Sequence, residues 1–345
     1  MENKKNKENI YELCQRKIVI TAEIGINHNG DLSLAKEMID AAAECGVDAV
    51  KFQAFNTPFM YSHLTPGFKH TDHDVFAQMK SLEVSDHWWP HLKAHAENHR
   101  LFFSCSIFDL PSLHVVKEFG IDFLKVASSE INNHAFLEAQ KELSPIVVVS
   151  TGMAFLDEIS QTIRFLNRIG IHQIILLECT SSYPSPPEAI HLLNIDFLRE
   201  TFHLPSGFSD HALGIHHAIA AAARNARFIE KHFTLDKTLT GPDQSISADP
   251  AEMKTLVHAV RDIEASLKTN SKMSFSPCEE NSREIGRKSL IASRNIREGE
   301  RITPENTVVK RPGKGIPPEQ ARFVYGREAQ TDISEDQWIT WEMIR

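Results

Sequence analysis

Residues 18–53, IVITAEIGINHNGDLSLAKEMIDAAAECGVDAVKFQ, hold the pattern that decides the fold. The runs Ile18 to Ile24 and Ala49 to Phe52 have the length and the apolar residue types of buried strands. Between them, Leu32 to Cys45 repeats apolar residues at helical spacing. A strand, a helix and a second strand in this order predict a parallel strand pair joined by a crossover helix.

The same unit recurs along the chain until about residue 267. Amphipathic stretches separate six further apolar runs, which cover residues 101–106, 123–126, 146–150, 174–178, 207–209 and 228–232. Together with the first two runs this makes eight strands, and eight is the number that closes a (β/α)₈ barrel. We therefore predict an α/β fold with a TIM barrel over residues 18–267. A doubly wound open sheet is the alternative.

The chain on either side of the barrel has a different character. Residues 1–17 form a polar N-terminal extension, and residues 268–284 are polar, contain Pro277 and are typical of a linker. The remaining residues, 285–345, predict a small module of strands and turns with a Pro/Gly-rich loop at 311–318. A module of this size buries little core by itself, so we expect it to dock onto another surface.

The composition excludes several classes of protein. The formal net charge is -9 and the chain has no long Lys/Arg run, so nucleic acid is not an expected partner. No apolar run reaches the length of a membrane span. The five cysteines form no CxxC pair, which favours a reducing compartment over a disulfide framework. We expect a cytoplasmic enzyme that does not contact a membrane.

Chemically competent side chains stand at or directly after the ends of the predicted strands. In a barrel the carboxyl ends of the strands meet at one mouth, where active sites lie. We therefore expect these side chains to converge. They include Glu23, Lys51, Gln53, Ser106, Lys125, Ser128, Glu130, Ser150, Ser181, Tyr183, Ser209, His211, Glu230 and His232, with Asp243 further along the chain.

Two of these residues, Lys51 and Lys125, lie inside apolar runs. A charge in such a run is costly unless it is paired. Two lysines at equivalent strand ends, with hydroxyls nearby, suit a ligand that carries both a phosphate and a carboxylate. No GxGxxG or GxxxxGK[ST] motif is present, so this phosphate is not expected to belong to a nucleotide.

His211 and His232 end consecutive predicted strands and should be neighbours. Two imidazoles without thiolates fit an open metal site that water and substrate oxygens complete, which favours Mn²⁺, Mg²⁺ or Co²⁺ over structural Zn²⁺. The pattern alone leaves open whether they bind a metal. A serine nucleophile is the rival interpretation, and no GxSxG motif supports it. Other histidines fall on predicted helices and are expected at the surface; they are His87, His91, His95 and His99.

Many of these residues lie in motifs that resemble the sialic acid (nonulosonate) synthase family. The resemblance runs from about residue 18 to the C-terminus, and the last part resembles the family's antifreeze-like (SAF) domain. The motifs are Ala22-Glu-Ile-Gly-Ile-Asn-His-Asn-Gly30, Ala49-Val-Lys-Phe-Gln53, Leu124-Lys-Val-Ala-Ser-Ser-Glu130, Ser150-Thr-Gly-Met153, residues 179–184, Ser209-Asp-His211, Glu230-Lys-His-Phe233, Gly241-Pro-Asp243, Ser289 to Ala292 and Val309 to Gly313.

The resemblance implies a barrel joined to a small β-clip domain, in a domain-swapped homodimer that uses phosphoenolpyruvate and a divalent metal, commonly Mn²⁺. It makes His211 and His232 the metal ligands, and Glu23 and Asp243 the acid/base candidates. The implied substrate-binding residues are Lys51, Lys125, Ser106, Ser128, Ser150 and Ser209 for phosphoenolpyruvate, with Gln53, Tyr183 and Asp243 facing the sugar, Arg311 reaching it from the partner's small domain, and Glu130 and Ser181 beside them.

Two positions depart from the family pattern. Where the family often has Ser-Thr-Pro-Phe-Asp, this chain has Cys105-Ser-Ile-Phe-Asp109, which retains one hydroxyl at Ser106. Ser181 stands at the position of a common family asparagine.

The implied reaction joins phosphoenolpyruvate to an N-acetylated amino sugar, with N-acetylmannosamine as the first expectation. A legionaminic or pseudaminic acid synthase, or an N-acetylneuraminate-9-phosphate synthase, is the alternative. A phosphoenolpyruvate aldol synthase that acts on another sugar phosphate and a non-catalytic sugar-binding barrel are more remote.

Overall fold

The computed structural model describes residues 8–65, 75–268 and 274–345. The chain divides into two compact units, which run from Met1 to Lys268 and from Thr269 to Arg345. Each unit has its own buried core.

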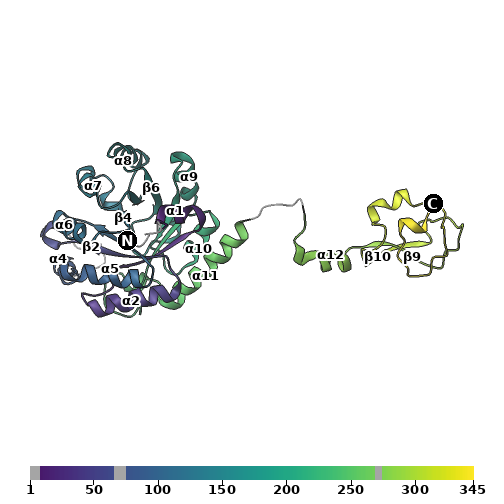
Figure 1. The fold of residues 1–345 in the computed structure, drawn as a ribbon, viewed down its shortest axis with the longest axis horizontal. Coiled ribbons are helices and arrows are strands. Elements are labelled where there is room, and N and C mark those ends of the chain that lie inside the picture. Colours follow the sequence, from purple (N-terminus) through teal and green to yellow (C-terminus); the bar gives the residue numbers. More distant parts are fainter. Residues whose placement is uncertain (1–7, 66–74, 269–273) are drawn as a thin grey trace, which may run out of the picture. The chain divides into compact units, whose positions relative to one another are not determined.

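The first unit is a closed barrel of eight parallel strands in sequential order (Figure 1), which confirms the predicted TIM barrel. The last strand closes the barrel against the first, with Glu23 opposite His232 in the register. The strands are β1 (Val19–Gly25), β2 (Ala49–Ala54), β3 (Phe102–Ile107), β4 (Phe123–Val126), β5 (Ile146–Ser150), β6 (Gln173–Cys179), β7 (Ser206–Asp210) and β8 (Phe228–His232).

Helices connect the strands and surround the barrel (Figure 1). One of them, α2, begins after Asp31, whose carboxylate accepts hydrogen bonds from the backbone N–H groups of Ser33 and Leu34. It ends at Gly46, whose φ of 84° suits glycine. No helix in the described part of the chain is long and apolar enough to cross a membrane. The helices of this unit are α1 (Ile10–Arg16), α2 (Leu32–Cys45), α3 (Thr57–Met60), α4 (Val75–Ser81), α5 (Trp89–Asn98), α6 (Leu110–Phe119), α7 (His134–Gln140), α8 (Leu156–Arg168), α9 (Leu193–Phe202), α10 (His216–Ala223) and α11 (Pro250–Leu267).

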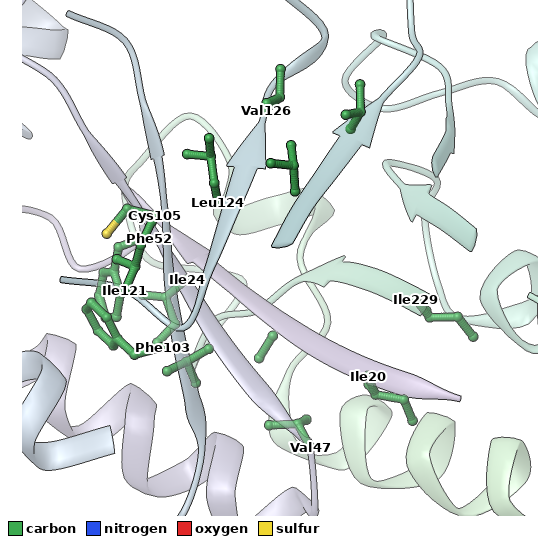
Figure 2. Close-up of a cluster of buried hydrophobic side chains, with 14 of the residues drawn as sticks. Ile20, Ile24, Val47, Phe52, Phe103, Cys105, Ile121, Leu124, Val126 and Ile229 are labelled. Atoms are coloured by element: carbon green, nitrogen blue, oxygen red, sulfur yellow. The ribbon is translucent and has the colours of Figure 1, made fainter. Parts of the chain in front are cut away.

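The main core lies between the outer face of the barrel and the helices. In β1, Ile20, Ala22 and Ile24 belong to this core and are fully buried. Figure 2 shows part of it, where the ring of Phe52 from β2 lies beside that of Phe103 from β3, with 5.6 Å between ring centroids. Because successive side chains of a strand alternate between its two faces, the residues between these apolar ones point into the barrel.

The amino-terminal end of the barrel interior is filled by apolar side chains. Val19, Phe123 and Phe228, near the starts of their strands, form a buried cluster separate from the main core. Ile10 and Leu13 of α1 belong to the same cluster, so this helix packs over that end of the barrel. The helix falls in the predicted N-terminal extension, of which residues 1–7 lie outside the described residues. The opposite end of the interior is left for polar side chains.

The second unit is built around two antiparallel strands, β9 (Ser289–Ala292) and β10 (Thr307–Lys310). Its core includes Leu290, Ile316 and Ile333. Strands and turns were predicted here, and the structure confirms them. The short helix α12 (Glu280–Gly286) lies mostly in the segment predicted as a linker, of which residues 269–273 lie outside the described residues.

Candidate active site

Four charged side chains from four strands meet inside the barrel. The ammonium group of Lys51 (β2) lies 2.7 Å from Glu23 (β1) and 3.9 Å from Glu230 (β8). The ammonium group of Lys125 (β4) lies 3.5 Å from the other carboxylate oxygen of Glu230. All four side chains are 5% exposed or less. Glu230 therefore links the two lysines that the sequence singled out.

Burial and mutual contact set the protonation of this cluster. Burial raises the pKa of Glu23, against the opposing effect of Lys51. It also lowers the pKa of Lys125. Burial acts to lower the pKa of Lys51 as well, but Glu23 and Glu230 offset it and the pKa is raised. Burial acts to raise the pKa of Glu230, but the two lysines hold it below its ordinary value. Lys51 and Glu230 are therefore the firmly charged members.

Three serine hydroxyls lie beside this charged cluster inside the barrel. Lys51 donates a 3.2 Å hydrogen bond to Ser106, and Lys125 donates a 2.7 Å hydrogen bond to Ser150. Ser209 donates to Glu230 at 2.9 Å. The three serines are buried. Three of the predicted serines therefore contact a member of the charged cluster directly.

Two more of the predicted hydroxyls lie beside the turn that follows β5. The hydroxyl of Ser128 accepts a 3.1 Å hydrogen bond from the backbone N–H of Gly152 and contacts the sulfur of Cys179 at 3.6 Å. A Cβ atom added at Gly152 would overlap the hydroxyl oxygens of both Ser128 and Ser181. Glycine is therefore required at this position, because any side chain would prevent the two hydroxyls from lying so close to the backbone.

His211 and His232 come together where β7 and β8 end, with 5.4 Å between their ring centroids. Nδ1 of His211 lies 2.9 Å from the carbonyl oxygen of Thr180, so this nitrogen carries the proton and Nε2 is free to accept a ligand. The ring of Tyr183 lies 4.2 Å from that of His211.

The two histidines fit a metal ion. Nδ1 of His232 is buried and has no hydrogen-bond partner among the described residues. Oδ2 of Asp243 lies 3.6 Å from this nitrogen, beyond hydrogen-bonding distance. Burial keeps the pKa of His232 well below its ordinary value, so its ring is neutral, as a metal ligand must be. A neutral imidazole with an unused nitrogen beside a second one is the donor set of an open site.

Asp243 follows β8, in a loop that is hydrogen-bonded to the segment after β1. Burial and the nearby Glu23 raise the pKa of its carboxyl to about 6. Its backbone carbonyl accepts a 2.6 Å hydrogen bond from Ser247, whose hydroxyl in turn accepts a 2.8 Å bond from the amide of Asn27. The buried Asn27 also donates to the carbonyl of Phe233 at 2.9 Å. These bonds fix the backbone that carries Asp243.

The remaining predicted residues are less closely tied to the cluster. Gln53 donates a 3.1 Å hydrogen bond to Glu23. Tyr183 is 53% exposed, so part of it faces solvent at the barrel mouth. Glu130 accepts hydrogen bonds from Ser129 and Asn133, which lie close to it in the chain. Arg311 is an exposed residue of the second unit.

Comparison with known proteins agrees with the resemblance seen in the sequence. Residues 38–272 match the NeuB family, and residues 287–345 match the SAF domain. The chain belongs to the NeuB family. Three proteins with similar sequences show how far the likeness extends.

This NeuB chain is 36% identical to the N,N'-diacetyllegionaminic acid synthase of Campylobacter jejuni, over 94% of the chain and 99% of that protein. It is 35% identical to the human N-acetylneuraminate-9-phosphate synthase, over 96% of both chains. The crystal structure of the N-acetylneuraminic acid (sialic acid) synthetase of Leptospira borgpetersenii matches with a TM-score of 0.69 and 34% identity, covering 77% of this chain and 90% of that chain. The protein is therefore a member of a family of sialic acid-type synthases.

The structure of this NeuB chain also shows contacts of residues to which the sequence gave no role. Glu230, noted only as a polar residue at a strand end, is the main one, because it joins both lysines and Ser209. Its position could have been predicted from the sequence. Glu230 stands two residues before His232 on one strand, so both side chains must point into the barrel. The hydrogen bond between Asn27 and Ser247 could not be predicted, because the two residues lie 220 residues apart in the chain.

Proposed function

We propose that this NeuB chain condenses phosphoenolpyruvate with an N-acetylated amino sugar, N-acetylmannosamine first, to give a nine-carbon 2-keto acid and phosphate. One observation carries the proposal: Lys51 and Lys125 converge within a buried layer lined by serine hydroxyls. Phosphoenolpyruvate presents a phosphate and a carboxylate on a three-carbon frame, which suits two ammonium groups and several hydroxyl donors. The names of the relatives support an amino-sugar acceptor.

The anion would take over contacts that protein groups now make. Lys51 and Lys125 hydrogen-bond Ser106 and Ser150 and face Glu230. An incoming phosphate or carboxylate would draw both ammonium groups toward itself, and the serine hydroxyls could rotate to donate to it. Ser128, Ser209 and the other predicted substrate-binding residues would complete this shell. Lysines already held in place by buried carboxylates cost little reorganisation when the anion arrives.

The reaction makes one carbon–carbon bond and breaks one carbon–oxygen bond. C3 of phosphoenolpyruvate adds to the aldehyde carbon of the open-chain sugar, and the aldehyde oxygen takes a proton to become a hydroxyl. Water adds to C2 and gives one proton to a base. The C2–O bond to phosphate then breaks, phosphate leaves, and loss of the second proton yields the ketone.

Two carboxyl groups are placed to move these protons. Glu23 contacts Lys51, so it lies beside the proposed phosphoenolpyruvate site and can accept the proton of the attacking water. Asp243 lies 3.6 Å from His232, so it is on the side proposed for the sugar aldehyde. Both have a raised pKa, and the value of about 6 for Asp243 lets this carboxyl hold or release a proton close to neutral pH.

We further propose that His211 and His232 hold a divalent ion, Mn²⁺ first, with Mg²⁺ or Co²⁺ as alternatives. When bound, such an ion supplies Lewis acidity toward the aldehyde oxygen of the sugar. The chain's own contribution is to hold both imidazoles in place: His211 through the carbonyl of Thr180 and through the ring of Tyr183, and His232 through its position at the end of β8.

The proposal includes the assembly as well. A domain-swapped homodimer would let Arg311 of one copy reach the sugar bound in the barrel of the other. The exposed position of Arg311 in its own unit leaves its guanidinium available for such a contact.

The test is phosphate release from phosphoenolpyruvate with Mn²⁺ and a panel of acceptors: N-acetylmannosamine, its 6-phosphate, and the diacetamido-trideoxy hexoses that lead to legionaminic and pseudaminic acid. Release that depends on one sugar and stops with a chelator is expected. With ¹⁸O in the bridging position of phosphoenolpyruvate, the label should appear in phosphate. Sugar-dependent release of unlabelled phosphate would contradict the proposed bond cleavage.

The diacetamido-trideoxy hexose that leads to legionaminic acid is the second candidate acceptor. Relatives named N,N'-diacetyllegionaminic acid synthase are 36% identical to this chain, which is close to the 35% identity of the human 9-phosphate synthase. The same panel separates the candidates by kcat/KM. No release with any of the four sugars, from folded and metal-loaded protein, would refute the proposed function and leave a sugar-binding barrel.

A further inference from the structure

A second group of potential metal ligands lies on the helical surface of the barrel unit, away from the strand ends. Asp40 stands on α2, His95 stands near the end of α5, and His99 is the residue directly after that helix. One ligand atom from each residue lies within 4.8 Å of the other two. Among the described residues, this is the group of three His, Cys, Asp or Glu side chains that converges closely enough to hold a cation.

The local fold brings these three side chains together. His95 and His99 are four residues apart, so they lie on one face of the helix, one above the other, with 5.3 Å between ring centroids. α2 and α5 are neighbours on the barrel, which places Asp40 opposite both rings. A pair of histidines at this spacing forms a chelate that is already in place before a metal binds.

The ligand atoms lie slightly closer together than they would around a bound ion. Nε2 of His95 and Nε2 of His99 each lie 2.7 Å from the same oxygen of Asp40. In a tetrahedral zinc site with bonds of about 2.0–2.1 Å, ligand atoms are separated by roughly 3.3 Å. A shift of the carboxylate by about half an ångström would open the centre of the group to an ion of this size.

A hydrogen-bonded cluster in which both imidazoles donate to one oxygen of Asp40 has the same distances, so metal binding itself must distinguish the two arrangements. The side chains are 45%, 27% and 37% exposed for Asp40, His95 and His99. This exposure leaves room for a water molecule as a fourth ligand and lets an ion enter from solvent.

We propose that Asp40, His95 and His99 bind a divalent transition ion, Zn²⁺ by preference, and thereby join α2 to α5. Two imidazoles and one carboxylate favour Zn²⁺ over Mg²⁺ or Ca²⁺, which prefer oxygen ligands, and over Mn²⁺, which binds such sites more weakly. The site is separate from the proposed active site. Its ion is held by a different face of the barrel and takes no part in the condensation.

The test counts bound Zn²⁺ in the full chain by chelator competition, because the proposed active site can also bind this ion. His211→Ala/His232→Ala serves as the background, so that only surface ions remain. In this background we expect one bound Zn²⁺, lost when His99→Ala or Asp40→Asn is added. His91→Ala is the matched control, since His91 is an exposed histidine one turn earlier on the same helix and outside the group; it should keep the ion.

Two further readouts support the count. Zn²⁺ at about a hundred times its dissociation constant should raise the melting temperature of the background protein by roughly 5 °C or more, and the added His99→Ala should abolish this rise. Co²⁺ in the same site should give the visible absorption of a low-coordinate complex. The proposal is overturned if the background protein binds no Zn²⁺, or if His99→Ala and His91→Ala bind the same amount. Neither result depends on the proposed enzymatic reaction.

Discussion

Glu230→Gln is the substitution that most directly tests the charged layer of the barrel. The change keeps the size of the side chain and an oxygen that can accept the hydrogen bond from Ser209. It removes the negative charge that faces Lys51 at 3.9 Å and Lys125 at 3.5 Å. The cluster then holds two lysines and only Glu23, whose pKa is already raised.

The size of the effect follows from burial. At about 4 Å and an effective dielectric constant of 20, one Lys–Glu pair is worth about 4 kcal/mol in Coulomb energy. Removing one partner of a buried pair destabilises a protein by about 3–5 kcal/mol, because the other charge is left uncompensated. For a unit of this size the melting temperature should fall by roughly 6–15 °C.

Binding of phosphoenolpyruvate should change in the opposite direction. In the wild-type protein the anion competes with Glu230 for both ammonium groups, and in Glu230→Gln this competitor is neutral. We expect the affinity for phosphoenolpyruvate to increase at least about tenfold, and the anion to restore much of the lost thermal stability. Calorimetric melting and isothermal titration, both without sugar and metal, measure the two effects.

Glu178→Gln is the matched control. Glu178 is also a buried glutamate of a barrel strand, but burial raises its pKa to about 7, so much of it is neutral already. Its replacement should change neither the melting temperature nor the affinity for phosphoenolpyruvate by comparable amounts. Equal melting temperatures for the two variants, or weaker phosphoenolpyruvate binding in Glu230→Gln, would refute the reasoning.

Two further predictions concern the acid/base group and the assembly. Burial and Glu23 raise the pKa of Asp243 to about 6, and its protonated form is the proposed donor to the aldehyde oxygen, so kcat/KM for the sugar should fall as the pH rises through about 6. Asp243→Asn should remove this limb of the pH profile; a limb that persists would assign it to another group. If Arg311 acts on the barrel of a second copy, co-refolding Arg311→Ala with His211→Ala should restore roughly a quarter of wild-type phosphate release, since half of the random dimers would carry one intact site. No recovery from a mixture shown to contain mixed dimers would place Arg311 in the site of its own chain.

The strands and their order could be predicted because each one is buried on both faces. Such strands appear in the sequence as short apolar runs, and β1, with all seven residues buried, is the clearest case. The short β7 was predicted within one residue at each end, because the polar Ser209 and Asp210 follow a strand of only five residues. The helix α1 could not be assigned to the barrel, since nothing local shows that Ile10 and Leu13 pack against strand residues far along the chain.

The same logic explains which site residues could be found. Lys51 and Lys125 stood out because a charge within an apolar run requires a partner. The partner itself was hidden in the run Glu230-Lys-His232, where three polar residues in a row resemble a solvated surface. Alternation separates them. Glu230 and His232 point into the barrel, while Lys231 points outward and pairs with Asp210 at 3.2 Å. Glu130 shows the limit of the rule, because it lies on a turn after β4, where alternation no longer holds.

Charge balance gives a further reason to expect more than phosphoenolpyruvate in the pocket. With Lys51, Lys125, Glu23 and Glu230 all ionised, the cluster is neutral, and phosphoenolpyruvate would add about three negative charges to a buried space. Such an excess is costly in a low dielectric unless protons or cations accompany the anion. The raised pKa of Glu23 and of Asp243 offers the protons, and the neighbouring imidazoles of His211 and His232 offer a place for a cation. We therefore expect the two halves of the site to depend on each other, with phosphoenolpyruvate bound more tightly by the lysines when the histidine end supplies positive charge.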